Sequence, residues 1–399
     1  MALEQTIYRE LKATPGVWRL AALLLALIAA AAGAWVYMEH HGHVVTGMNN
    51  QIVWGLPHVF AIFLIVAASG ALNVASIASV FGQSAYKPMA RFSSLLAITL
   101  LVGGLAIVVL DLGRPDRLIV AMTHFNFTSI FTWNILLYTG FIGVVAVYLA
   151  MQMARRLGYK WVKAAGFVAF LWRLILTTGT GSIFGWLVAR NSYDAAIMAP
   201  MFIIMSFGFG LAFHILAMLT LFALNDRPFG DALLIRLGRL LGVFVAASLY
   251  FTVIFHLTNL YAAEHRAYEI WLLTSGGLYT LLLWGVYLGL GGLVPMALVF
   301  LNPSRSSTLL ASVLVVLGGF AQVYVIVIGG QAYPLDIFPG FEVLSGFHEG
   351  EISAYSPTIW EFLLGLGGVA LALFAAGLGA KVLRVLPTNL SDANVAAKS

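Results

Sequence analysis

Long apolar stretches separated by short polar segments recur along the whole chain. Ten of them are long enough to cross, as helices, a hydrocarbon core of roughly 30 Å. They are residues 17–38, 52–81, 91–111, 128–151, 164–189, 196–223, 240–262, 270–300, 307–329 and 357–384. Glycines interrupt 270–300, which predicts either one long tilted helix or a short helix followed by a span. The pattern predicts an all-α, polytopic transmembrane protein of about ten spans.

Composition supports a single membrane domain and excludes some classes of cofactor. The 399 residues are 61% hydrophobic and 9% charged, and the mean hydropathy is +0.95. No polar stretch is long enough for a soluble domain, so we treat 1–399 as a single integral membrane domain with an outer loop at 330–356 and a tail at 385–399. The chain has no cysteine. Iron–sulfur clusters and covalently attached haem c are therefore excluded within this subunit.

The basic residues predict the orientation in the membrane. Sixteen lie in alternate loops or tails on one side, four (Arg114, Arg117, Arg190 and Arg266) lie on the other, and Arg173 lies inside a span. The positive-inside rule then predicts that both termini lie in the cytoplasm. The membrane that the protein crosses is expected to be the cytoplasmic (inner) membrane. The net charge of +5 is a topology signal in this setting and indicates no nucleic-acid partner.

The most unusual segment is Leu110 to Arg117, which carries four charges directly after an apolar helix. Asp111 lies at the negative pole of that helix, where an acid is disfavoured. Arg114 and Arg117 are close enough in sequence to compensate it. The segment is either an interfacial stop signal or a charged pocket at the membrane surface. Its place on the outer side, where arginines are scarce, favours the pocket.

A layer of polar side chains is expected at the depth of this segment. His58 and His256 each lie about six residues inside the outer end of a span, or roughly 9 Å below the surface. Four further residues are expected near that level: Trp54, Trp133, Asn134 and Glu361. Ionisable groups inside a membrane usually face a cavity or a polar ligand. A quinone pocket fits this layer, with proton-exchanging groups flanked by aromatic rings.

Two other interpretations of the histidines remain open. A b-type haem could be ligated by His58 and His256, the only pair expected at one depth. Each histidine could instead satisfy a backbone carbonyl or hydroxyl between helices. His40, His41 and His43 lie close together but lack a fourth ligand, so we assign no metal site.

The run Leu110 to Pro115 resembles the LDLGRP signature of the NrfD/PsrC family of quinone-interacting membrane subunits. The segment Asn50 to His58 resembles the entry of the family's first core helix, and Pro357 to Glu361 is similar to the last-span entry of its ten-helix members, including the HybB branch. Within the family, Gly47 to Phe81, Asp111 to Ser129 and Trp172 to Arg190 most resemble DsrP of the DsrMKJOP complex of dissimilatory sulfur metabolism.

The resemblance implies two four-helix bundles, at 52–189 and 196–329, with one peripheral helix at each end of the chain. It implies a site for menaquinone or ubiquinone near the outer face, where His58 contacts a ring oxygen and Asp111, held by Arg114, relays protons. Trp54, Trp133, Asn134, His256 and Glu361 would line that site. The implied partners are an extracytoplasmic ferredoxin-like iron–sulfur subunit, a multihaem cytochrome c, and a second membrane subunit with a cytoplasmic catalytic partner.

The expected activity is therefore that of a quinone-reactive subunit in a respiratory, sulfur-oxidation or sulfite-reduction complex. Within redox chemistry, the alternative is the anchor of a polysulfide or tetrathionate reductase or of a hydrogenase. A secondary transporter is the alternative of a different class, and it predicts polar groups at the bilayer midplane. A purely structural anchor would tolerate changes at His58 and Asp111.

Overall fold

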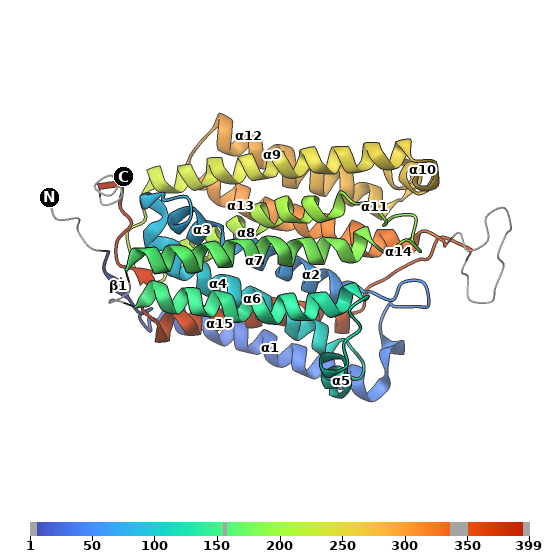
Figure 1. Ribbon diagram of the computed structural model, residues 1–399, viewed down its shortest axis with the longest axis horizontal. Helices are drawn as coiled ribbons and strands as arrows, with labels where there is room; N and C mark the ends of the chain where they lie inside the picture. The colour runs from blue at the N-terminus through green and yellow to red at the C-terminus, as the bar shows by residue number, and fades with distance from the viewer. Residues whose placement is uncertain (1–5, 155–157, 336–349, 394–399) are drawn as a thin grey trace.

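The computed structural model describes residues 6–154, 158–335 and 350–393, which are nearly all helical. Ten helical segments of this described part are long and apolar enough to cross a membrane, as expected (Figure 1). They are α1 (Pro15–His41), α2 with α3 (Leu56–Ala71, Asn73–Ser79), α4 (Ala90–Leu110), α6 (Ile130–Met153), α7 (Tyr159–Gly185), α8 (Met198–Ala223), α9 (Asp231–Tyr261), α11 to α12 (Leu278–Leu281, Val294–Leu301), α13 to α14 (Arg305–Tyr324, Gly330–Ala332) and α15 (Ile359–Val382). Residues 336–349 of the expected outer loop and 394–399 of the expected tail lie outside the described residues.

Shorter elements connect the spans. Two are α-helices, α5 (Leu118–Thr123) and α10 (Ala263–Ile270). The 3₁₀ turns are η1 (His43–Val45), η2 (Ser84–Met89) and η3 (Pro115–Arg117). Three segments are π-helical: η4 (Trp271–Ser275), η5 (Leu282–Leu293) between α11 and α12, and η6 (Val325–Gly329) between α13 and α14. Segments of π-helix are frequent at functional sites.

Eight spans form the two expected four-helix bundles. In the first, α2 packs on α4, α4 on α6, α6 on α7, and α7 on α2. In the second, α8 packs on α9, α9 on α12, η5 and α12 on α13, and α13 on α8. The bundles meet where α2 and α7 pack on α8. The helix α2 lies at this junction, and its residues are nearly all buried.

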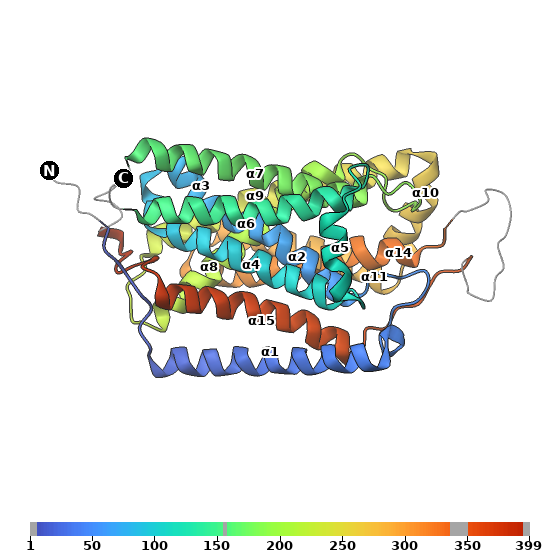
Figure 2. The ribbon, with the colours of Figure 1, turned by 60° about the horizontal axis from the view of Figure 1, so that its bottom comes forward.

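The two remaining spans form one layer against the first bundle. The first span, α1, packs on α15, and α15 packs on α4 (Figure 2). Next to them, strand β1 (Tyr8–Arg9) pairs antiparallel with β2 (Leu386–Pro387). The first and last described residues lie at the same end of the molecule (Figure 1), as an even number of spans requires. We call this end, which carries the described basic residues of the alternate loops and tails, the basic end.

Two glycines set the distance between the bundles. A side chain at Gly70 of α2 would overlap the carbonyl of Ser206, and one at Gly210 of α8 would overlap the backbone of Gly70 and Ala71. The two backbones therefore touch at this crossing, which only glycine permits. Close approach through small residues is a common source of stability between membrane helices, because lipid offers no hydrophobic driving force.

The glycine-interrupted stretch at 270–300 forms a short helix followed by a span. The helix α10 and segment η4 end at Ser275, and the next span begins at Leu278. Gly277 has a φ of +57°, a conformation that favours glycine. The helix is interrupted at this position, and the single tilted helix is not formed.

The arginine inside a span has the buried partners that its permanent charge requires. Arg173 is buried, and its guanidinium donates to the Ser69 carbonyl at 3.1 Å and to the Asn73 side-chain oxygen. It also lies over the rings of Phe170 and Phe207. These contacts tie α7 to the bend between α2 and α3.

Candidate functional site: a buried histidine–carboxylate pair

His58 and Asp111 lie next to each other at the end of the first bundle opposite the basic end. His58 occupies the first turn of α2, which begins after Gly55 and has Pro57 in its first turn. Asp111 caps the C-terminus of α4. The Nδ1 atom of His58 lies 2.9 Å from Oδ2 of Asp111, whose side chain is fully buried while that of His58 is 21% exposed. The partly open imidazole connects the buried carboxylate to the surroundings.

The Asp111 carboxylate has unused capacity to accept hydrogen bonds. Within the described part of the chain, neither of its oxygens receives a well-directed hydrogen bond. The contact with His58 is close, but the ring N–H does not point along the line between the two atoms, and Nδ1 itself is also without a directed bond. Buried carboxylates without donors are costly. This arrangement suits a ligand that brings a hydroxyl group.

Aromatic rings from three elements gather at Trp54, which lies beside His58. The Trp54 ring stacks beside His58 with centroids 6.2 Å apart. The Trp54 ring also makes edge-on contacts with Phe131 of α6 and Phe184 of α7, with ring centroids 6.3 and 5.9 Å apart. All four helices of the first bundle therefore contribute to one site. A planar aromatic ligand would find stacking partners here.

An apolar surface adjoins this site. Leu112 directly follows Asp111 and is exposed, as are Ile119 and Val120 on α5. Phe127 and Phe131, at the start of α6, are exposed as well. Exposed apolar side chains at the end of a membrane bundle face lipid at little cost, so a lipid-soluble molecule could approach the pair from this side.

Arg114 does not hold Asp111, contrary to the expectation from sequence. Its guanidinium makes a bidentate pair with Asp116, at 3.0 and 2.9 Å, and both side chains are more than half exposed. Gly113 turns the chain here with a φ of +67°, and a side chain at Gly113 would come within 3.2 Å of His43. The hydrogen bonds from Arg114 lower the pKa of Asp116. The ionisable side chain beside Asp111 is His58.

The contacts of Glu361 are those of a residue that stabilises the fold. It is fully buried at the start of α15 and completes a capping box with Thr358. Its oxygens also accept from the Gly47 N–H at 2.8 Å and from the Tyr355 hydroxyl at 2.6 Å. These donors occupy the carboxylate, which ties the loop before α2 to the last span. Glu361 therefore helps to fix the loop that leads into α2.

Trp133 and Asn134 lie on different faces of α6. Trp133 is exposed and donates to the Phe127 carbonyl at 3.0 Å. Asn134 is buried and bridges α6 to α7 by donating to the Gly179 carbonyl at 3.0 Å. The contacts found for these two residues hold helices and loops together, and Phe131 takes the place beside Trp54.

The two bundles that hold this geometry match a known protein family. A family model described as "Polysulphide reductase, NrfD" matches residues 44–334, well over half of the chain. This protein belongs to the NrfD family. The match begins just before α2 and ends just after α14, so it covers both four-helix bundles and leaves out α1 and α15.

Curated relatives extend over nearly the full length of this NrfD-family chain. An Hdr-like menaquinol oxidoreductase integral membrane subunit of Archaeoglobus fulgidus is 28% identical, over 92% of this chain and 93% of its own. A putative membrane subunit of a dimethyl sulfoxide reductase from Halobacterium salinarum is also 28% identical, with 92% and 90% covered. A selenate reductase subunit of Mesobacillus selenatarsenatis is 22% identical, with 84% and 87% covered.

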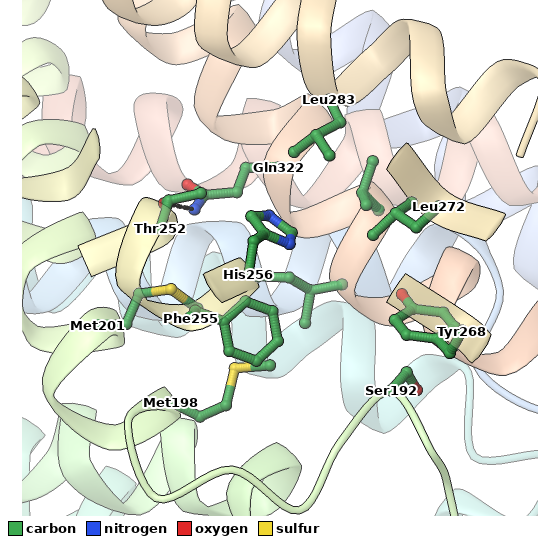
Figure 3. Close-up of a pocket in the computed structure, with 12 residues that line it drawn as sticks. Ser192, Met198, Met201, Thr252, Phe255, His256, Tyr268, Leu272, Leu283 and Gln322 are labelled. Atoms are coloured by element: carbon green, nitrogen blue, oxygen red, sulfur yellow. Dashed lines mark hydrogen bonds between the residues drawn. The ribbon is translucent and has the colours of Figure 1, made fainter. Parts of the chain in front are cut away.

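His256 belongs to a second, separate pair in the other bundle. Its Nδ1 lies 2.5 Å from Oε1 of the fully buried Glu269, whose other oxygen accepts from Asn259 at 3.2 Å. Figure 3 shows His256 between Thr252 and Gln322 on one side and Leu272 and Tyr268 on the other. The cavity there is about 20 Å³, which suffices for a water molecule.

This geometry does not fit a haem held by both histidines. The residues that line the cavity at His256 come from the second bundle and the loop before it, whereas His58 contacts Trp54 and Asp111. A cavity of about 20 Å³ leaves no room for a macrocycle.

Gln331 and Arg190 position Trp54, and neither was anticipated from the sequence. The side-chain oxygen of Gln331 accepts from the N–H groups of Val53 and Trp54, each at 3.0 Å, and its amide donates to the Trp54 carbonyl at 3.0 Å. Arg190 donates to the carbonyls of Gln51 and Gln331, at 2.7 and 3.0 Å. In the sequence, Gln331 falls just after the predicted span 307–329, in the expected outer loop, and carries no signal of this role. Gln331 at the end of the second bundle thus fixes the position of Trp54, the aromatic residue beside His58 in the first bundle.

Replacing Gln331 by Ala is expected to loosen the segment before α2. Each lost hydrogen bond contributes about 0.5–1.5 kcal/mol, so the amides of Val53 and Trp54 should exchange with solvent deuterium about tenfold faster. Hydrogen-exchange mass spectrometry of this segment measures the change. The matched control is Gln322→Ala on α13, which removes a buried amide that donates to Thr252 instead. Equal exchange of the segment in both variants would contradict the positioning role.

Proposed function

We propose that this protein is the quinone-reactive membrane subunit of a multi-subunit oxidoreductase. The observation that carries the proposal is the buried Asp111 carboxylate, which lies 2.9 Å from His58, lacks a directed donor and is bordered by Trp54. A quinol offers what this site lacks, namely a hydroxyl donor on a flat aromatic ring. The name of the Archaeoglobus relative, a menaquinol oxidoreductase subunit, supports menaquinone as the quinone.

The pair would act as the proton acceptor for the ring. Oxidation of a quinol breaks two O–H bonds and releases two protons and two electrons, and reduction of the quinone reverses this. Asp111 would accept the hydrogen bond and then the proton of one hydroxyl. His58 lies between the buried carboxylate and the open side, so it would pass that proton outward. The electrons would leave to, or arrive from, an iron–sulfur cluster in a partner subunit, because this chain has no cysteine.

The partner is proposed to dock at the end of the molecule that carries His58. The bias of basic residues supports a position of this end outside the cytoplasm, which would suit an extracytoplasmic ferredoxin-like iron–sulfur subunit. Membership of the DsrP branch would add a multihaem cytochrome c and a second membrane subunit with a cytoplasmic catalytic partner. The reductase names of two relatives favour a second candidate, the membrane anchor of a terminal reductase. Both candidates share the quinone site.

The first experiment is to purify the complex gently, extract and quantify its quinone, and record oxidised and dithionite-reduced optical spectra. About one quinone per complex, without a b-type haem spectrum from this subunit, is the expected result. A b-type spectrum that disappears on replacing His58 or His256 would overturn the assignment of His58 to the quinone ring. Identification of the co-purified soluble subunits by mass spectrometry separates the DsrP-like complex from a reductase anchor.

A further inference from the structure

A small polar cavity lies in the second bundle, beside the His256–Glu269 pair. His256 lies near the C-terminal end of α9, and the cavity next to it has a volume of about 20 Å³. Side chains of α8, α9, α10 and α13 contribute to its lining. Neither the family match nor the proposed quinone chemistry gives this cavity a role.

The three π-helical segments of the described chain converge on this cavity. Its lining includes Leu272 from η4, Leu283 from η5, and Val325 and Ile326 from η6. In a π-helix the hydrogen bonds run from residue i to residue i+5, and such segments are frequent at functional sites. Their convergence on one small space indicates that the cavity is a built feature of the bundle.

The Glu269 carboxylate determines which nitrogen of His256 carries the ring proton. Its Oε1 atom lies 2.5 Å from Nδ1 of His256, and its Oε2 atom accepts from the Asn259 amide at 3.2 Å. Because an ionised carboxylate can only accept hydrogen bonds, Nδ1 must be the nitrogen that carries the proton. In the neutral ring, Nε2 is then an acceptor that needs a donor.

The cavity wall holds a second acceptor that needs a donor. Gln322 of α13 is buried beside His256 (Figure 3), and its amide nitrogen donates to the Thr252 hydroxyl at 3.1 Å. That hydroxyl lies 2.8 Å from the hydroxyl of Tyr287. Within the described part of the chain, the side-chain oxygen of Gln322 receives no hydrogen bond. A buried polar atom without a partner is costly.

We propose that this cavity binds one water molecule, which donates one hydrogen bond to Nε2 of His256 and the other to Oε1 of Gln322. A cavity of this size holds about one water, and buried waters bond to polar groups that would otherwise lack partners. Cavities that stay empty are apolar, whereas this one is lined by both acceptors. The same small volume excludes a quinone ring.

The water would complete a chain of hydrogen bonds across the second bundle. The chain runs from Glu269 on α10 through His256 on α9 and the water to Gln322 on α13. It would hold His256 in one tautomer and join three elements of the bundle. The His58–Asp111 pair would have the opposite role, since its carboxylate is left without a directed donor. Because no quinone takes part at the cavity, this proposal does not depend on the proposed function.

The test is electron cryo-microscopy of the intact complex at a resolution that shows ordered water. We expect density for one water at about 2.7–3.2 Å from both acceptors. Gln322→Leu puts an apolar side chain in place of the amide and should abolish this density. Ser312→Ala is the matched control, because it removes a buried hydroxyl from the same helix that donates to the Thr308 carbonyl at 2.8 Å. The water should remain in this variant.

An empty cavity in the unmodified complex would overturn the proposal, and so would a water that keeps its position in Gln322→Leu. Loss of the water in Ser312→Ala as well would show that it depends on the packing of α13 in general, which also contradicts the proposal.

A second measurement uses the unmodified chain, so it does not depend on whether Gln322→Leu folds. Solid-state NMR of the complex with ¹⁵N-labelled histidine reports which ring nitrogens of His256 carry a proton. We expect a proton on Nδ1 and a hydrogen bond between Nε2 and water. A proton on Nε2 with none on Nδ1, or a ring without a contact to water, would contradict the proposed arrangement.

Discussion

Replacing Asp111 by Asn is expected to lower quinol-dependent electron transfer in the assembled complex by about 10²–10⁴-fold. The amide keeps the shape of the carboxylate beside His58 but cannot take up the proton of a quinol hydroxyl. The turnover number should fall more than the apparent KM rises, because stacking on Trp54 would still hold the ring. Steady-state rates with a soluble quinol analogue measure both quantities.

Asp116→Asn is the matched control. It removes one negative charge from the same loop, but that carboxylate is exposed and pairs only with Arg114 among the contacts found. Exposed ion pairs contribute about 0–1 kcal/mol, so the rate should stay within about twofold. His58→Gln should resemble Asp111→Asn, and the double variant should lose little more than either single one, because the pair acts as a unit. Retention of half the normal rate by Asp111→Asn would exclude the proton-accepting role.

Replacing Gly210 by Ala should produce a large loss of stability for the addition of a single methyl group. The added carbon would overlap the backbone of Gly70 and Ala71 at the junction of the two bundles. Overpacking costs about 1–3 kcal/mol, and the upper end applies here because backbone atoms cannot turn aside as a side chain can. Thermal unfolding of the purified protein in a mild detergent measures the change.

Gly208→Ala provides the control within the same helix. A side chain there would have its nearest neighbour, Val315, at 4.0 Å, so α8 should accept it with a change within about 0.5 kcal/mol. Equal melting temperatures for the two variants would show that the bundles separate easily at this crossing. Gly70→Ala on the facing helix should repeat the loss seen for Gly210→Ala.

The number of spans could be predicted because membrane crossing depends on length and apolarity, which are properties of a segment alone. The break at Gly277 could be posed only as an alternative, since a glycine permits a turn without requiring it. The pairing of α1 with α15 depends on contacts between the two ends of the chain, which no local pattern records.

For the site, the sequence indicated the residues more reliably than their partners. His58 and Asp111 were both singled out, but Asp111 was assigned to the nearest arginine in sequence. The turn at Gly113 directs Arg114 to Asp116, and the fold brings His58 from another helix. Gln331 was missed because a buried amide carries no charge and has no characteristic motif. Its role appears only when the four hydrogen bonds of its side chain, to Val53, Trp54 and Val327, are known.

The layer made by α1 and α15 bears on how this architecture can vary. The two spans pack on each other, and α15 alone provides the broad contact with the first bundle through α4. The family match stops short of both. Without α1, helix α15 would still pack on α4, whereas α1 without α15 would lose its main packing partner. Loss of α1 is thus the simpler change, and an arrangement that keeps only α1 is disfavoured. Because either single loss leaves an odd number of spans, it would also move one terminus to the opposite side of the membrane.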